Sequence, residues 1–183
     1  MMRSNGLKHL SPLIAVGLVT ILLIGCWMFT RPKKGKLVES WDLPGKTLKF
    51  RIEAYCERNT FVGGAYYDFR SAPATSENWQ TIMTFRNDDA VPIPQRNVRF
   101  VNEQVAYAFI GWKYAITTDA GRTWNVWNAE KDLPGWQCCN YRLIDDVEVR
   151  PDGSGKMIME PIPGRSGELP ELHTADFGRH WTP

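Results

Sequence analysis

The chain has 183 residues, with 22 Lys and Arg against 20 Asp and Glu, which is enough for one domain of ordinary size with a buried core. Six of the basic residues but only one acid precede residue 40, which leaves 16 basic and 19 acidic residues beyond it, a net charge of −3. This excludes the concentrated basic patch on the folded domain that a nucleic-acid-binding protein needs.

The first predicted element is a single membrane-spanning helix over residues 10–29. The run has no charged residue and no polar face, and its length of about 20 residues suits a bilayer crossing. A tail over residues 1–9 precedes it. A basic juxtamembrane linker is expected over residues 30–46, before a domain that occupies residues 47–183.

Two interpretations of the apolar run stay open. The segment Leu23-Ile24-Gly25-Cys26 resembles a lipobox, in which Cys26 would carry a lipid. The run continues past Cys26 through Trp27 to Phe29, however, where a mature lipoprotein usually turns polar. Trp27 also suits an aromatic anchor at the membrane interface. We therefore favour an uncleaved signal anchor, with the lipoprotein as the alternative.

The flanking charges bear on the side of the membrane at which the domain lies. Two basic residues precede the helix and four follow it, namely Arg31, Lys33, Lys34 and Lys36. The positive-inside rule would place the domain in the cytoplasm. The short tail could itself cross the membrane, and the family resemblance given below favours an exported domain at a bacterial inner (plasma) membrane, facing the periplasm.

From residue 47 onward the chain is predicted to be all-β. Apolar and polar residues alternate over 48–54, 98–100 and 147–149, and each pattern fits a strand with one buried face. Eight Trp residues and frequent Gly and Pro suit short strands that are joined by tight turns.

One motif occurs twice in this domain. Residues 117–124 read TTDAGRTW and match the pattern Ser/Thr-x-Asp-x-Gly-x-Thr-Trp, and residues 174–181 read TADFGRHW, with His180 in the second Thr position. The Asp is placed to accept backbone hydrogen bonds in a tight hairpin, and the Gly can take a positive φ. We expect a structural role for Thr117, Asp119, Gly121, Thr123, Trp124, Thr174, Asp176, Gly178 and Trp181.

Three units share an order of short strands and turns that ends in a strand beginning at Trp. They span residues 47–86, 97–128 and 144–183. Trp79, Trp124 and Trp181 lie 45 and 57 residues apart, near the blade period of about 40–50 residues in propellers. The segment 71–79 of the first unit reads SAPATSENW and lacks the Asp and Gly, so the motif alone does not establish a third copy.

These motifs resemble those of the BNR/Asp-box superfamily, which includes sialidases and propellers of the photosystem II stability/assembly-factor type. The resemblance implies four-stranded blades and, in many members, export. Only about three units fit here, whereas a closed propeller usually needs four or more. We expect a partial or small propeller-like fold, which could be an open stack, a compact sandwich, or part of a propeller completed by self-association.

The sialidase resemblance implies three Arg around a carboxylate and a Tyr nucleophile with an acidic partner. None of the candidates stands in a recognisable motif, namely Arg51, Arg70, Arg99, Tyr66, Tyr67 and Glu103. We therefore predict no catalytic residue, no cofactor and no metal site. The alternative for the acidic run 145–148, Asp-Asp-Val-Glu, is that it binds a hard cation.

The cysteines and one loop complete the candidate sites. In an oxidising compartment Cys56 could pair with Cys138 or Cys139, and buried thiols are the alternative. The turn-rich segment 131–141 interrupts the repeat, so its surroundings are the predicted binding loop. The aromatic residues proposed for that loop are Trp127, Trp136 and Tyr141.

Two functions from different classes follow. The first is a membrane-anchored, non-enzymatic module that binds another protein, in complex assembly or as a toxin-immunity protein, and it predicts a flat or edge-like surface with exposed aromatic residues. The alternative is a carbohydrate-binding or glycosidase-like protein, which predicts aromatic and Arg side chains that converge in one concave pocket.

Overall fold

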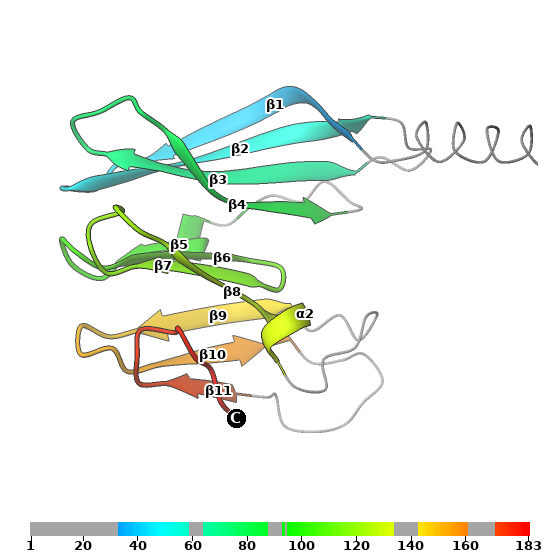
Figure 1. The fold of residues 1–183 in the computed structure, drawn as a ribbon. Helices are drawn as coiled ribbons and strands as arrows, with labels where there is room; N and C mark the ends of the chain where they lie inside the picture. The colour runs from blue at the N-terminus through cyan, green and yellow to red at the C-terminus, as the bar shows by residue number, and fades with distance from the viewer. Residues whose placement is uncertain (1–32, 59–63, 88–92, 94, 134–142, 161–170) are drawn as a thin grey trace, which may run out of the picture.

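The computed structural model describes residues 33–58, 64–87, 93, 95–133, 143–160 and 171–183. Within them the chain forms three antiparallel β-sheets and very little helix (Figure 1). The all-β prediction is therefore confirmed. No helix in these ranges is long and apolar enough to cross a membrane, and the predicted span over residues 10–29, with Cys26, lies outside them.

Each sheet is a meander in which the strands pair in chain order. The first sheet contains β1 (Lys33–Leu43), β2 (Leu48–Arg58), β3 (Ala65–Pro73) and β4 (Gln80–Asn87). The second contains β5 (Val98–Phe100), β6 (Ala106–Ile110), β7 (Lys113–Thr117) and β8 (Asn125–Asn128). The third contains β9 (Ile144–Val149), β10 (Gly155–Met159) and β11 (Glu171–Thr174). Two single turns of helix, η1 (Gln95–Asn97) and α2 (Ala129–Asp132), flank the second sheet.

The third sheet carries the start of a fourth strand. His173 and Thr182 exchange backbone hydrogen bonds of 2.7 and 3.0 Å, as an isolated bridge. In the second sheet the equivalent pair is Ile116 and Asn125. Both pairs join the residue before the first Thr of the motif to the residue after its Trp, so the second and third sheets end in the same way.

The sheets stack face to face with the second in the middle (Figure 1). One apolar core joins the first and second sheets, and another joins the second and third. Along β6, Ala106 and Ala108 belong to the first of these cores, whereas Tyr107 and Phe109 belong to the other. Because both faces of the middle sheet are covered, this strand is apolar throughout instead of alternating with polar residues.

The segment expected to be a juxtamembrane linker contributes the edge strand β1. Its side chains are mostly exposed, and Gly35, Trp41 and Leu43 are only half-buried. It is held by backbone pairing with β2 from Lys33 to Leu43, with two register shifts. A strand with so little buried side-chain surface has no alternating pattern, so periodicity did not indicate it.

The outer faces of the stack are polar at both ends. On the first sheet, the outward positions of β2 are Lys49, Arg51 and Glu53, which alternate with the core residues Leu48, Phe50 and Ile52. On the third sheet, Glu148, Lys156 and His173 pair side by side across three strands, and all are exposed. Polar faces at both ends are typical of capping units in a stack of repeats.

Candidate functional site

The first copy of the motif, residues 117–124, forms the turn between β7 and β8, and we call the two copies the first and second Asp-box after the pattern that they resemble. The buried hydroxyl of Thr117 donates to Asp119 Oδ1 at 2.8 Å and accepts the N–H of Gly121 at 2.9 Å. Asp119 also accepts the N–H of Thr123 at 2.9 Å and its hydroxyl at 2.6 Å. Ala120 and Gly121 take φ values of +55° and +83°, and the Gly does so without steric cost. Both carboxylate oxygens of Asp119 are thus occupied within the turn.

The second Asp-box has the same geometry. Thr174 donates to Asp176 Oδ1 at 2.8 Å, and the N–H of Gly178 donates to Thr174 at 2.9 Å. The N–H of His180 lies 3.1 Å from Asp176 Oδ1, and its Nδ1 lies 2.5 Å from Asp176 Oδ2. Phe177 and Gly178 have φ values of +62° and +73°. The imidazole therefore takes the place that a Thr hydroxyl has in the first box.

These contacts hold both carboxyl groups in the ionised form. Hydrogen bonds from the side chain and N–H of Thr123 lower the pKa of Asp119 to about 2. Burial raises the pKa of Asp176, but hydrogen bonds from the ring and N–H of His180 outweigh it and lower this pKa to about 2. A carboxylate fixed in this way braces a turn and is a poor proton donor near neutral pH.

The Trp of each box packs on the sheet that precedes its own. Trp124 meets Phe50 of the first sheet with ring centroids 5.4 Å apart, and Trp181 meets Tyr114 of the second sheet at 5.5 Å. Among the described residues neither buried indole N–H has a hydrogen-bond partner. Each contact is therefore apolar packing between neighbouring layers.

The turn over residues 74–79 occupies the equivalent place in the first sheet. In each of the three sheets a buried Ser or Thr stands just before this turn. The residue three positions after it donates its backbone N–H, at 2.9 Å, to a carbonyl of the preceding hairpin. The hydroxyls belong to Ser71, Thr117 and Thr174. The donors and acceptors are Ala74 and Thr47, Ala120 and Gln104, and Phe177 and Gly153. The first turn thus keeps the anchoring of the boxes without their Asp and Gly.

Trp79 stands at the box-Trp position of a sheet that no other described sheet precedes. Its half-buried ring therefore lies on the outer face of the stack. The Arg51 guanidinium lies 4.3 Å from the ring centroid, and Lys49 Nζ lies 5.1 Å from it. Glu77 accepts the indole N–H at 3.1 Å and forms an ion pair with Lys49. Charged side chains here replace the apolar layer that covers Trp124 and Trp181.

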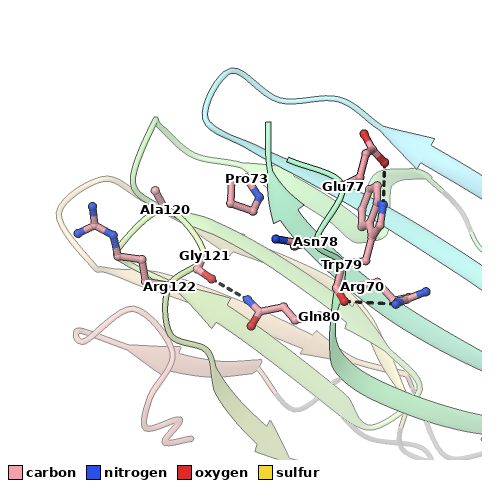
Figure 2. A pocket seen from close by; sticks show the side chains of 9 residues that line it. All are labelled: Arg70, Pro73, Glu77, Asn78, Trp79, Gln80, Ala120, Gly121 and Arg122. Atoms are coloured by element: carbon pink, nitrogen blue, oxygen red, sulfur yellow. Dashed lines mark hydrogen bonds between the residues drawn. The ribbon is translucent and has the colours of Figure 1, made fainter. Parts of the chain in front are cut away.

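An open groove of about 660 Å³ lies between this turn and the first Asp-box (Figure 2). Trp79 and Glu77 lie on one side of it, and Ala120 and Arg122 lie on the other, with the Arg122 guanidinium pointing away from Trp79. The Gln80 amide donates to the carbonyl of Gly121 at 2.7 Å and so ties the two turns together. Exposed Arg122 has no ion-pair partner among the described residues. We refer to this site as the Trp79 groove.

The outer face beside the groove carries a network of buried carboxylates. Glu53 and Asp68 are opposite each other on β2 and β3 and are 6% and 5% exposed. Glu53 accepts hydrogen bonds from Tyr55 at 2.6 Å and Arg70 at 3.0 Å, and Asp68 forms an ion pair with Lys34. The hydrogen bond to Glu53 raises the pKa of Tyr55 to about 12, so this phenol remains a neutral donor.

Of the six residues considered for a sialidase site, Arg51 and Arg70 are register partners on β2 and β3, but the six do not form one cluster. Arg51 donates to Asp42 at 2.6 and 2.8 Å, whereas Arg70 binds Glu53. Arg99 belongs to the second sheet. The remaining three are also separate, with Tyr67 buried in the core, Tyr66 half-buried on β3, and Glu103 exposed 3.9 Å from Lys46.

The acidic run on β9 is neutralised by arginines. Its pairs are Asp145 with Arg96 at 3.5 Å, Asp146 with Arg99 at 3.8 Å, and Glu148 with Arg150 at 3.6 Å. Within the part of the chain that the structure describes, no group of three His, Cys, Asp or Glu is placed to hold a metal ion. The pair of Asp146 with Arg99 instead joins the edge strands β9 and β5, and the pair of Asp145 with Arg96 joins β9 to η1.

The predicted binding loop is only partly visible in the described residues. Trp127 is 4% exposed and packs in the core between the second and third sheets, so it offers no surface for binding. Trp136, Tyr141, Cys138 and Cys139 lie outside the described residues. Cys56 is a half-buried free thiol whose Sγ accepts the N–H of Lys36 at 3.2 Å.

The Trp79 groove was not among the sequence-predicted sites. The spacing of 45 residues between Trp79 and Trp124 is the signal that could have indicated it, because it places Trp79 at the position of the box Trp. Because the turn over residues 74–79 lacks the Asp and Gly of the motif, its equivalence to the two box turns could not be recognised. The alternation of Lys49 and Arg51 with core residues predicted only that these two side chains face outward.

Comparison with known proteins gives no assignment. No family model matches the chain, and no curated protein and no solved structure matches it.

Proposed function

We propose that this protein is a membrane-anchored, non-enzymatic protein-binding module built from Asp-box repeats. The apolar run over residues 10–29 holds it at a bacterial inner membrane, with the β domain on the periplasmic side. The matching hydrogen bonds of the two boxes support a place in the Asp-box superfamily. Three meanders with polar outer faces support a self-contained stack of blade-like units that does not close into a propeller.

The observation that carries this proposal is the position of Trp79. Trp181 is 5% exposed, and the half-buried ring of Trp124 packs on Phe50 of the neighbouring sheet. Trp79 has no described sheet over it, and only charged side chains flank its ring. Trp and Arg are the residue types most enriched where a few side chains dominate binding between proteins. Arg51 lies against the ring, and Arg122 lies on the opposite side of the groove.

The charges of the groove indicate the chemistry of the partner. Lys49 is paired with Glu77, and Arg70 with Glu53, whereas Arg122 has no ion-pair partner among the described residues. A partner segment that presents a carboxylate to Arg122 and an apolar side chain to Trp79 therefore fits best. Assembly of a membrane complex and neutralisation of a toxin are both settings for such a module.

A carbohydrate-binding or glycosidase-like function is the second candidate. Two observations favour it, namely the planar polar side chains of Asn78 and Gln80 in the groove and the hydrogen-bonded Tyr55–Glu53 pair on the same face. A sugar stacks on an open aromatic face, however, and Arg51 lies over the ring of Trp79 at 4.3 Å. We therefore place a polypeptide first.

Site-specific photo-crosslinking in cells of the source organism tests the proposal. The photoreactive residue p-benzoylphenylalanine replaces Asn78 in the groove or Lys156 on the opposite outer face, and both positions are exposed. We expect a discrete protein adduct from position 78 that is absent from position 156 and is lost when Trp79→Ala is added. An equal pattern from both positions contradicts the proposal, as does a glycoside hydrolysis activity that Tyr55→Phe abolishes.

Fusions at Pro183 test the topology. Alkaline phosphatase is active only outside the cytoplasm, whereas green fluorescent protein is fluorescent in the cytoplasm. We expect an active phosphatase fusion and a dark fluorescent fusion. The reverse result would mean that the basic residues after the apolar run set the orientation, and the partner search would move to the cytoplasm.

A further inference from the structure

The edge strand β1 of the first sheet exposes both apolar and basic side chains. We propose that it rests on the bilayer that anchors the chain, with its basic residues at the anionic headgroups and its apolar pair at the boundary with the acyl chains. The inference depends on the membrane anchor in the proposed function but not on the partner of the Trp79 groove. Its evidence is an exposed apolar pair, a set of unpaired cations beside it, and a short tether to the apolar run.

The apolar pair is Leu37 and Val38, which are 52% and 68% exposed. The register of β1 with β2 shifts on both sides of Leu37, and such a bulge lets neighbouring side chains project from the edge. An apolar pocket of about 480 Å³ lies next to them, with Val38, Trp41 and Ile93 in its lining. Apolar side chains exposed together on an edge mark a contact surface.

The cations surround this pair. Lys33 and Arg58 are register partners at one end of the first sheet, and both are exposed, as is Lys36. None of the three has an ion-pair partner among the described residues, whereas Lys34 is committed to Asp68. Lysines at an anionic membrane surface strengthen attachment by about fivefold each, provided that they lie within a Debye length of it.

The tether brings these groups to the membrane. Only residues 30–32 separate the apolar run from Lys33, and they span at most about 14 Å when fully extended. Leu37 follows four residues later, which adds roughly 13 Å along an extended strand. The turn of the Trp79 groove lies at the opposite end of the strands (Figure 1), so this contact leaves the groove accessible.

Photolabelling from within the lipid tests the contact on the full chain. The chain is reconstituted in vesicles of phosphatidylcholine alone or with phosphatidylglycerol, with a trace of the corresponding lipid carrying an acyl-chain diazirine. Adducts are then mapped by mass spectrometry. We expect adducts on residues 10–29 in both lipids, and adducts on Leu37 and Val38 that increase when phosphatidylglycerol is present. Val126, which is 41% exposed on β8, is the matched position that should stay unlabelled.

The double substitution Lys33→Gln and Lys36→Gln provides the charge control. Both side chains are exposed, so the fold and the labelling of residues 10–29 should not change. Labelling of β1 in phosphatidylglycerol should fall by roughly tenfold or more. The inference is overturned if residues 10–29 are labelled and β1 is not, or if β1 is labelled equally in both lipids. Absence of label on residues 10–29 would instead overturn the membrane anchor itself.

Discussion

The Asp119→Ala substitution should destabilise the domain because it removes the acceptor at the centre of the first Asp-box. The carboxylate accepts three hydrogen bonds, one from the hydroxyl of Thr117 and two from Thr123. The consequences differ for the two donors. Thr123 is exposed and can bond to water after the change, but Thr117 is 1% exposed and its hydroxyl would lose its acceptor inside the protein.

The magnitude follows from this difference. A buried polar group left without a partner costs about 1–3 kcal/mol, and an exposed hydrogen bond contributes on the order of 0.5 kcal/mol. The free energy of unfolding should therefore fall by about 2–3 kcal/mol. For a domain of this size that corresponds to a decrease of roughly 5–10 °C in Tm. Thr123→Val removes only an exposed hydroxyl and should cost about 0.5 kcal/mol.

Urea unfolding of the full chain in detergent micelles, followed by near-ultraviolet circular dichroism, measures both variants. The Asp119→Ala variant should unfold at a clearly lower urea midpoint than Thr123→Val, with an unchanged slope. Equal midpoints for Asp119→Ala and the wild type would refute the argument, because the box would then not brace the hairpin. Equal losses in the two variants would show that the exposed contacts matter as much as the buried hydroxyl.

Three further predictions test the repeat. The folded-state pKa of Asp119 and of Asp176 is about 2, below the unfolded value of about 3.9, so stability should fall between about pH 4 and pH 2. The pKa values of Asp42, Glu77 and Asp152 are also lowered, so urea midpoints of the double Asp119→Asn and Asp176→Asn variant should show a smaller decrease than those of the wild type. Trp181→Ala should cost about 3–5 kcal/mol and Trp79→Ala less than about 1 kcal/mol, as measured by thermal unfolding, and equal costs would contradict their different environments. Gly178→Ala places a Cβ 2.7 Å from the ring of Tyr114 at a φ of +73°, so Tm should drop by several degrees.

The fold class and the two boxes could be predicted because both rest on local patterns. Alternation over residues 48–54 predicts a strand with one buried face, and β2 has that pattern. Asp and Gly at fixed offsets predict a tight turn, and the turns at Asp119 and Asp176 contain it. These signals lie within a few residues of one another, so a single sequence is enough to reveal them.

The edge strand and the groove depend on contacts between distant residues. The strand β1 was expected to be a linker because most of its side chains are exposed, and its pairing with β2 follows from backbone groups that carry no sequence signal. Trp127 was expected in a binding loop, but the middle sheet is covered on both faces and buries it. The order in which the sheets stack determines both the exposure of β1 and the burial of Trp127. The periodicity of a single sequence does not predict that order.

The place where the first unit departs from the repeat is also the place where we propose binding. The turn over residues 74–79 keeps the anchoring of the boxes through Ala74 but has lost the Asp and Gly that brace the other two turns. Trp79 on the outer face buries less apolar surface than Trp181 and therefore contributes less to stability. Stability alone does not explain a Trp at this position. Departures from local consistency of this kind are typical of functional sites. If the turn only capped the stack, replacement of Trp79 by a polar residue would leave both stability and cross-linking unchanged, whereas a binding role requires that cross-linking alone be lost.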